Sequence, residues 1–200
     1  TGQGVPATYT INKGDVLQFS QSSELSGSPI QSTKPVGVVG GNRCMVIPDT
    51  SISACDAGHQ MIPPVKALGS EYVAAHYEDR FPGVPENVPW RIVGAVEGTT
   101  LSYDPAPPPG APSTVSVGQV VQFESDTPFV VKSQDADHPF YMSAHMSGCT
   151  AVSSEFVNMY SVRPDGNQND ITPKPSGMPY FISCCCVFCD GSPAAGVSSA

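Results

Sequence analysis

The stretch TINKGDVLQF at residues 10–19 returns as TVSVGQVVQF at residues 114–123, an offset of 104 residues (114 minus 10) with five of ten positions identical. Each copy has a glycine at its fifth position, Gly14 in the first, where we expect a tight turn. The residues after the turn alternate, so that Leu17 and Phe19 would share one face of a strand. The pattern therefore predicts the same turn and strand twice.

The similarity between the two copies continues beyond these strands. The matching pairs are Pro29-Ile30 with Pro128-Phe129, Lys34-Pro35 with His138-Pro139, and Cys44 with Cys149. A further strand is expected after each second proline, over residues 36–39 and 140–143. The chain is therefore predicted to contain two related repeat units, the second of them truncated.

Composition favours strands over helices. Gly (19) and Pro (21) together fill 40 of 200 positions, and both residues interrupt helices and central strands, so only short elements fit between them. We predict an all-β fold of β-sandwich-like antiparallel sheets. Its expected parts are a first repeat unit (1–104), a Pro-rich connector (105–112), a partial second unit (113–158) and an irregular Cys-containing tail (159–200), disordered or out of frame.

Two segments of the first unit have no counterpart in the second. Residues 90–96 and 99–103 have strand-like patterns and are predicted to form a hairpin that turns at Glu97-Gly98. Residues 65–77 are the one stretch with a helical pattern, although Gly69 interrupts it.

Charge and hydropathy exclude several classes of partner. The net charge is −9 and the basic residues form no cluster, so we expect neither nucleic acid nor an anionic membrane surface as a partner. No apolar run reaches the roughly 20 residues that a spanning helix needs, so no membrane insertion is expected. The chain starts at Thr1 without a signal peptide and reads as a piece of a larger protein, with further domains of the same parent as neighbours.

Seven cysteines indicate an oxidising compartment, outside the cell or at its surface. Cys44 and Cys55 flank a turn-forming segment, and we favour a disulfide between them over two buried free thiols. Because the number is odd, Cys149 is expected to find its partner outside this chain.

The remaining residues with chemical potential give no catalytic, cofactor-binding or metal site. The tail cysteines Cys184, Cys185, Cys186 and Cys189 include one pair with zinc spacing, but a tetrahedral site needs a second pair. Asp135 and Asp137 could contribute to a calcium site, but they supply few of the six to eight oxygens required, so a solvated acidic loop is favoured. Four histidines, at positions 59, 76, 138 and 145, are too scattered to predict catalysis.

An ordered series of short motifs resembles a known family. The series is Gly14-Asp15-Val16-Leu17-Gln18-Phe19, Glu24-Leu25-Ser26-Gly27-Ser28, Ile30-x-Ser32-x-Lys34-Pro35-Val36, Gly40-Gly41-Asn42-x-Cys44, Ala54-Cys55-Asp56, Gln60-Met61-Ile62-Pro63-Pro64, Gly69-Ser70-Glu71-Tyr72-Val73, Trp90-Arg91-Ile92-Val93, Glu97-Gly98-Thr99-Thr100, Lys132-Ser133 through Pro139 and Glu155-Phe156-Val157-Asn158. Over residues 8–158 the chain resembles the N-terminal domain family of IgGFc-binding proteins, and the resemblance is expected to end after Asn158.

The resemblance implies an extracellular or surface-exposed β-rich domain with a binding or adhesive role, no enzymatic activity and no cofactor. The expected partner is a protein or glycoprotein, and no motif of the family maps antibody Fc contacts onto residues of this chain. Two alternatives stay open, a structural spacer and a carbohydrate-active enzyme fragment. An enzyme would bring carboxylates, or a His and a nucleophile, together in a concave site.

Overall fold

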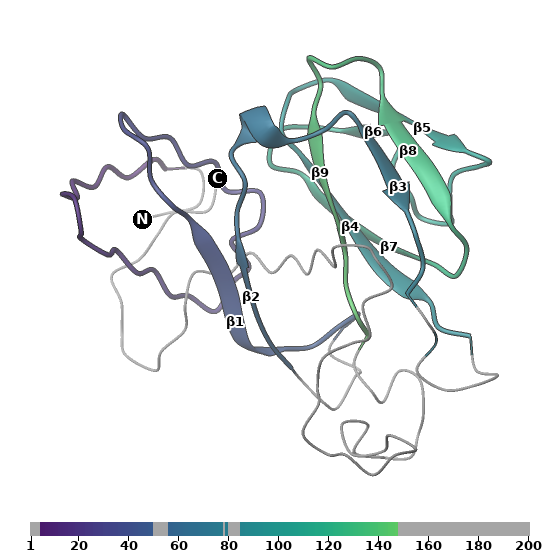
Figure 1. Cartoon of the computed structure of the whole chain (residues 1–200), viewed down its shortest axis with the longest axis horizontal. Helices are drawn as coiled ribbons and strands as arrows, with labels where there is room; N and C mark the ends of the chain where they lie inside the picture. The colour runs from purple at the N-terminus through teal and green to yellow at the C-terminus, as the bar shows by residue number, and fades with distance from the viewer. Residues whose placement is uncertain (1–4, 50–55, 78, 80–84, 148–200) are drawn as a thin grey trace, which may run out of the picture.

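The computed structural model describes residues 5–49, 56–77, 79 and 85–147. The predicted all-β class is confirmed (Figure 1). In chain order the elements are β1 (Val39–Met45), β2 (Asp56–Met61), the 3-10 turn η1 (Val65–Ala67), β3 (Glu71–Ala74), β4 (Val88–Gly94), β5 (Thr99–Asp104), β6 (Thr114–Val115), β7 (Val120–Ser125), β8 (Phe129–Ser133) and β9 (Phe140–Ala144). The predicted tail at 159–200 lies outside the described residues.

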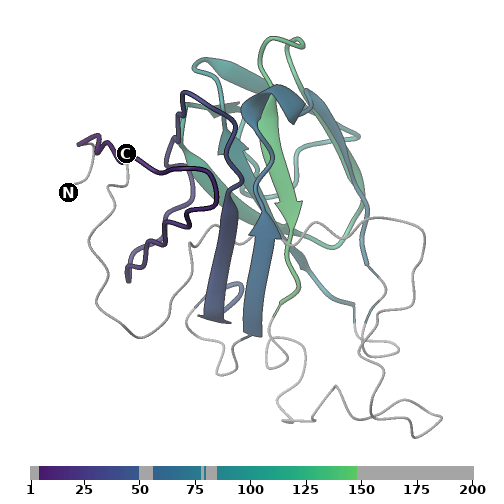
Figure 2. The same cartoon turned by 60° about the vertical axis from the view of Figure 1, so that its left-hand side comes forward.

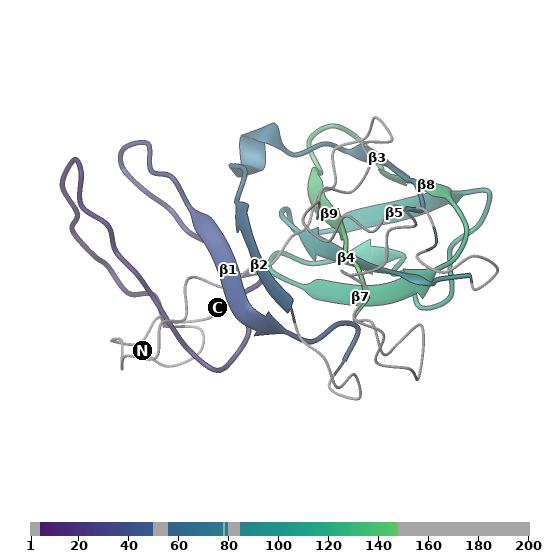
Figure 3. The same ribbon diagram turned by 60° about the horizontal axis from the view of Figure 1, so that its bottom comes forward.

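Two antiparallel sheets form a sandwich. One sheet has the strand order β3-β8-β5-β6 and the other β7-β4-β9, while β1 and β2 pair only with each other. Figures 1 and 2 show the β1–β2 hairpin as a separate ribbon between the sandwich and the N-terminal segment. Strands from 71–104 and from 114–144 share both sheets of the sandwich, which Figure 3 shows from below.

The core lies between these two sheets. Alternating residues of β4, among them Trp90 and Ile92, point inward and are buried. Phe129 of β8 is 3% exposed, and its ring centre lies 5.5 Å from that of Trp90 and 5.9 Å from that of Phe123. Such edge-to-face and tilted aromatic contacts join the two sheets. The buried cluster consists of Ala74, Val88, Trp90, Ile92, Leu101, Val115, Phe123, Phe129, Val131, Phe140 and Met142.

The predicted hairpin at 90–103 is wrong, although both of its strands exist. β4 pairs with β7 and β9, whereas β5 pairs with β6 and β8. The turn at Glu97-Gly98 carries the chain from one sheet to the other, with Gly98 at a positive φ of 72°. Both strands turn an apolar face to the same core, through Ile92 and Leu101, and this burial separates them.

The predicted helical stretch at 65–77 is also wrong. Only Val65–Ala67 forms a single 3-10 turn, and Glu71–Ala74 is strand β3. β3 pairs in register with β8, from Glu71 opposite Lys132 to Ala74 opposite Phe129. Pairing with the edge of β8 therefore overrides the weak helical preference of these residues.

The repeated turn is confirmed in both copies. The amide of Asp15 donates to Asn12 O over 3.0 Å, and the amide of Gln119 donates to Ser116 O over the same distance. In each turn the side chain of the last residue also accepts from the amide of the first, at 2.7 Å in the first copy and 3.0 Å in the second. Gly14 and the matching glycine of the second copy both have positive φ, 92° and 75°.

The strand expected after the first turn is wrong. Residues 120–125 form β7, but residues 15–19 form no strand. Phe123 is 5% exposed, whereas the equivalent Phe19 is only half-buried, and Val16 is 91% exposed, whereas the equivalent Val120 is half-buried. The two copies therefore lie in unlike surroundings. β7 exists because β4 supplies its backbone partners, and the first copy has no such neighbour among the described strands. Of the two later strands, β9 is confirmed, and only the end of 36–39 joins β1.

The N-terminal segment nevertheless packs on the sandwich at one place. A Cβ atom added to Gly27 would lie 2.0 Å from Gly118 O, so the two backbones are in direct contact and leave no room for a side chain. Leu25 is buried beside this contact, and Glu24 forms a salt bridge with Arg91 of β4. The contact fixes the segment to the outer side of the β7-β4-β9 sheet.

Candidate functional site

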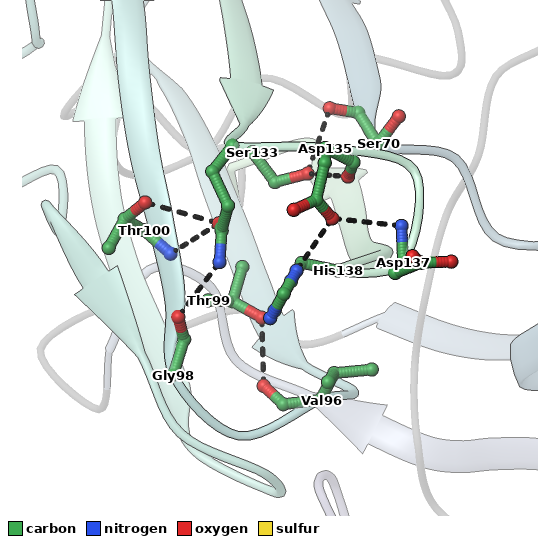
Figure 4. Close-up of polar contacts among 10 residues, drawn as sticks. Ser70, Val96, Gly98, Thr99, Thr100, Ser133, Asp135, Asp137 and His138 are labelled. Atoms are coloured by element: carbon green, nitrogen blue, oxygen red, sulfur yellow. Dashed lines mark hydrogen bonds and ion pairs between the residues drawn. The ribbon is translucent and has the colours of Figure 1, made fainter.

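One end of the sandwich carries a cluster of interlocked polar residues, which we call the Asp135 surface (Figure 4). It consists of the β8–β9 loop (134–139), the β4–β5 turn (95–98) and residues 69–70, together with Thr100 and Ser133. These segments meet because β8 lies between β3 and β5 in the sheet. The register of that sheet places Leu101 opposite Ser133, so Thr100 adjoins the loop.

Gln134 connects the loop to the neighbouring turn. Its Oε1 accepts from the amide of Thr100 at 2.8 Å and from the hydroxyl of Thr100 at 3.1 Å. Its Nε2 donates to Gly98 O at 3.0 Å. An exposed glutamine with both ends of its amide engaged holds two loops in one relative position.

Asp135 organises the loop from within. Its Oδ1 accepts from the amide of Asp137 at 2.9 Å and from Nδ1 of His138 at 2.6 Å. The hydrogen bond from His138 is the main reason why the pKa of Asp135 is lowered. Because both bonds use Oδ1, the second oxygen of this exposed carboxylate keeps its capacity to accept a hydrogen bond from a partner.

Ser133 anchors the base of the loop and does not act with the nearby histidine. Its hydroxyl lies 3.3 Å from Ser70 O and 3.0 Å from Asp135 O, and its amide donates to Ser70 O at 2.8 Å. In the described part of the chain no hydrogen bond joins this hydroxyl to His138. The geometry suits a rigid polar surface better than an activated nucleophile.

The predicted acidic loop thus exists, with its two aspartates in different roles. The side chain of Asp135 accepts a hydrogen bond from the backbone amide of Asp137 and so stabilises the turn. The two carboxylates are therefore not arranged as a pair of metal ligands. Among residues 5–49, 56–77, 79 and 85–147, no three His, Cys, Asp or Glu side chains lie close enough to hold a metal ion.

The four histidines are on separate parts of the fold. His59 is on β2, His76 follows β3, His138 is in the β8–β9 loop and His145 follows β9. His145 is 1% exposed, its Nε2 lies 3.1 Å from Ser143 Oγ, and its Nδ1 has no hydrogen-bond partner in the described part of the chain. Burial, aided by the positive charge of Arg91, lowers the pKa of His145 to about 4.

Of the cysteines for which we made predictions, the described residues include only Cys44. Cys44 is exposed on β1 and is disulfide-bonded, whereas its predicted partner Cys55 lies outside the described residues, so the pairing stays a prediction. Cys149 and the tail cysteines (184–189) also lie outside the described residues. No helix in the described ranges has the length and apolar character to cross a membrane.

Sequence reasoning missed a polar network on the outer face of the β7-β4-β9 sheet. Arg91 donates to Gln122 Oε1 at 2.9 Å and forms a salt bridge with Glu24, and Gln122 Nε2 donates to Pro48 O at 2.9 Å. The alternation of β4 does place Arg91 on the face opposite Trp90. That signal gives the direction of the side chain, but not the residues that cover it.

Tyr72 supports the Asp135 surface from below, and removing its hydroxyl gives a testable effect. This hydroxyl accepts from the amide of Gly69 at 2.9 Å and donates to Phe140 O at 2.7 Å, joining the two sheets. We expect Tyr72→Phe to lower the free energy of unfolding by about 1–2 kcal/mol, because two bonds are lost in a half-buried place. Urea denaturation measures this loss.

Tyr103→Phe is the matched control, because its hydroxyl donates a single bond, to Pro112 O at 2.7 Å. A smaller loss is expected there. An unchanged urea midpoint for Tyr72→Phe would show that the bridge between the sheets contributes nothing.

The fold and this surface together define a β-sandwich module that presents a rigid polar loop surface at one end. A family model described as IgGFc binding protein matches residues 1–173, more than half of the chain, and the chain therefore belongs to this family. The predicted resemblance is confirmed, and it extends past Asn158, where we expected it to end. The family is not known as a catalytic one. Comparison with curated proteins and with solved structures gave no match.

Proposed function

We propose that this chain is a non-catalytic module that binds a protein or glycoprotein ligand outside the cell or at its surface, through the Asp135 surface. The observation that carries the proposal is the bonding of Gln134 and Asp135, which fixes an exposed loop in one conformation before any partner arrives. A surface that is already ordered loses little conformational entropy on binding. Loops at the ends of a rigid sandwich are common binding sites.

The charge of the surface favours a ligand with hydrogen-bond donors. Asp135 and Asp137 are both exposed. The pKa of Asp135 is lowered, so its carboxylate stays ionised at more acidic pH than an ordinary aspartate does. The family description names the Fc part of IgG, a glycoprotein, and this makes Fc the first probe to use. Placement in a larger surface or secreted protein, among further domains of the same parent, is part of the proposal.

Surface plasmon resonance tests the proposal with three probes, namely IgG Fc, Fc from which the glycans have been removed, and a mucin-type glycoprotein. We expect the chain to bind at least one of them. The double variant Gln134→Ala, Asp135→Ala should weaken binding by about tenfold or more, since an equivalent loss of about 1.4 kcal/mol corresponds to one or two interface hydrogen bonds.

The matched control is Asp126→Ala. Asp126 is exposed in the β7–β8 turn, at the opposite end of β8 from Asp135. Equal losses for the two variants would contradict the assignment of the surface. If none of the three probes binds to the folded chain, the structural spacer becomes the better hypothesis.

A further inference from the structure

The two sequence copies differ in the exposure of the side chains at three positions that belong to the core in the second copy. Val115, Phe129 and Phe140 are 2%, 3% and 0% exposed. The matching residues of the first copy are Ile11, Ile30 and Val36, which are 43%, 63% and 46% exposed. The first copy therefore keeps apolar side chains at core positions without burying them, which is unusual for several residues within one segment.

The strand pairing shows what buries the second copy. β6 pairs with β5, β7 and β9 pair with β4, and β8 pairs with β3 and β5. No two of the strands β6 to β9 pair with each other. Every ladder of the second copy is thus made with the segment that contains β3 to β5, residues 71–104. A copy without such a segment has no strands to pair with.

The first copy is in this situation within the described chain. Its turn at Asn12–Asp15 has the geometry of the turn at Ser116–Gln119, yet residues 10–38 contain no strand. Among the described strands, the one segment of the β3–β5 kind is already paired with the second copy. The local structure of the first copy is therefore formed, and its sheet partners are what it lacks.

We propose that residues 10–38 are a docking surface for a second three-strand segment of the β3–β5 kind, contributed by another module of the same family. The two together form a sandwich like that of β3 to β9, with Ile11, Ile30 and Val36 in its core. The incoming segment presents alternating apolar residues, as Val88, Trp90 and Ile92 do in β4. This interface does not depend on the proposed function, because it uses a different part of the chain from the Asp135 surface.

A fusion tests the proposal. A second copy of residues 69–112 is placed ahead of Thr1 through a flexible Gly/Ser linker, in the otherwise complete chain. Hydrogen exchange measured by mass spectrometry then reports on residues 15–19 and 29–38. We expect amide exchange in these peptides to slow by about 100-fold or more, because exposed backbone groups enter a stable sheet.

Two sets of variants make the result decisive. Trp90→Ser with Ile92→Ser, introduced only in the added segment, should abolish the gained protection. Ile11→Asp with Ile30→Asp in the first copy should do the same and leave the protection of β7 and β9 unchanged. Amide exchange that stays fast at residues 15–19 and 29–38 of the fusion would overturn the proposal. The same result is expected if the added segment only replaces the resident β3 to β5 beside the second copy, and it counts against the proposal in that case too. Protection that survives both sets of variants would also overturn it.

Discussion

Phe129→Ala is expected to lower the free energy of unfolding by about 3–5 kcal/mol, the usual cost of deleting a buried aromatic ring. Phe129 is 3% exposed, and its ring centre lies 5.5 Å from that of Trp90, 5.9 Å from that of Phe123 and 6.0 Å from that of Tyr103. The substitution removes contacts to both sheets and leaves a cavity that β8 cannot close. This loss is large compared with the total stability of a typical domain, about 5–15 kcal/mol.

Ile30→Ala is the matched control, because Ile30 is the sequence equivalent of Phe129 in the first copy and is 63% exposed. We expect a change within about 0.5 kcal/mol there. Urea denaturation followed by the fluorescence of Trp90, the single tryptophan, measures both variants, with circular dichroism as a second probe. Comparable losses at the two positions would contradict the burial difference between the copies.

The second large effect is a loss of stability at acidic pH that depends on His145. The folded protein holds this histidine neutral, with a pKa of about 4 against the ordinary 6.5, mainly because it is buried. The unfolded chain binds the proton near pH 6.5 and the folded chain only near pH 4. The contribution of His145 to the free energy of unfolding is therefore fully present above pH 6.5 and is lost as the pH decreases toward 4. The loss is about 1.4 kcal/mol per pH unit and about 3 kcal/mol in all.

His145→Gln isolates this contribution, because glutamine does not titrate while the carboxylates of the chain still do. Between pH 7 and pH 4 the variant should lose about 3 kcal/mol less stability than the unmodified chain. Urea denaturation at pH 7, 5.5 and 4 measures the difference. His59→Gln, at an exposed position on β2, should keep the full pH dependence. Parallel pH profiles for His145→Gln and the unmodified chain would show that His145 takes up its proton without opposing folding.

Local patterns predicted turns and strand-forming segments well. The turns after Asn12 and Ser116 need only a glycine and a side-chain acceptor close in sequence, and both form as expected. The alternation in β7 and the run after Pro139 also gave real strands. The same alternation at Leu17 failed, because a pattern cannot tell whether another strand is available to pair with it.

The candidate site was predictable only as an acidic loop at Asp135 and Asp137. Its rigidity comes from contacts between residues far apart in sequence, such as Gln134 with Thr100 and Ser133 with Ser70. Gln134 and Ser70 lie in motifs of the family resemblance, but nothing in the sequence predicts these contacts, since a glutamine or serine in a loop is usually only solvated. Sheet order alone brings these residues together.

Residue types and short spacings are enough to predict the all-β class, the family, the repeated turn and the apolar positions of both copies. Pairing across the whole fold places β4 and β5 in different sheets, gives strands of the sandwich to the second copy and not to the first, and fixes the β8–β9 loop. The physical reason is that a strand is stable only beside another strand. Which strands meet depends on burial across the whole chain and not on the local pattern.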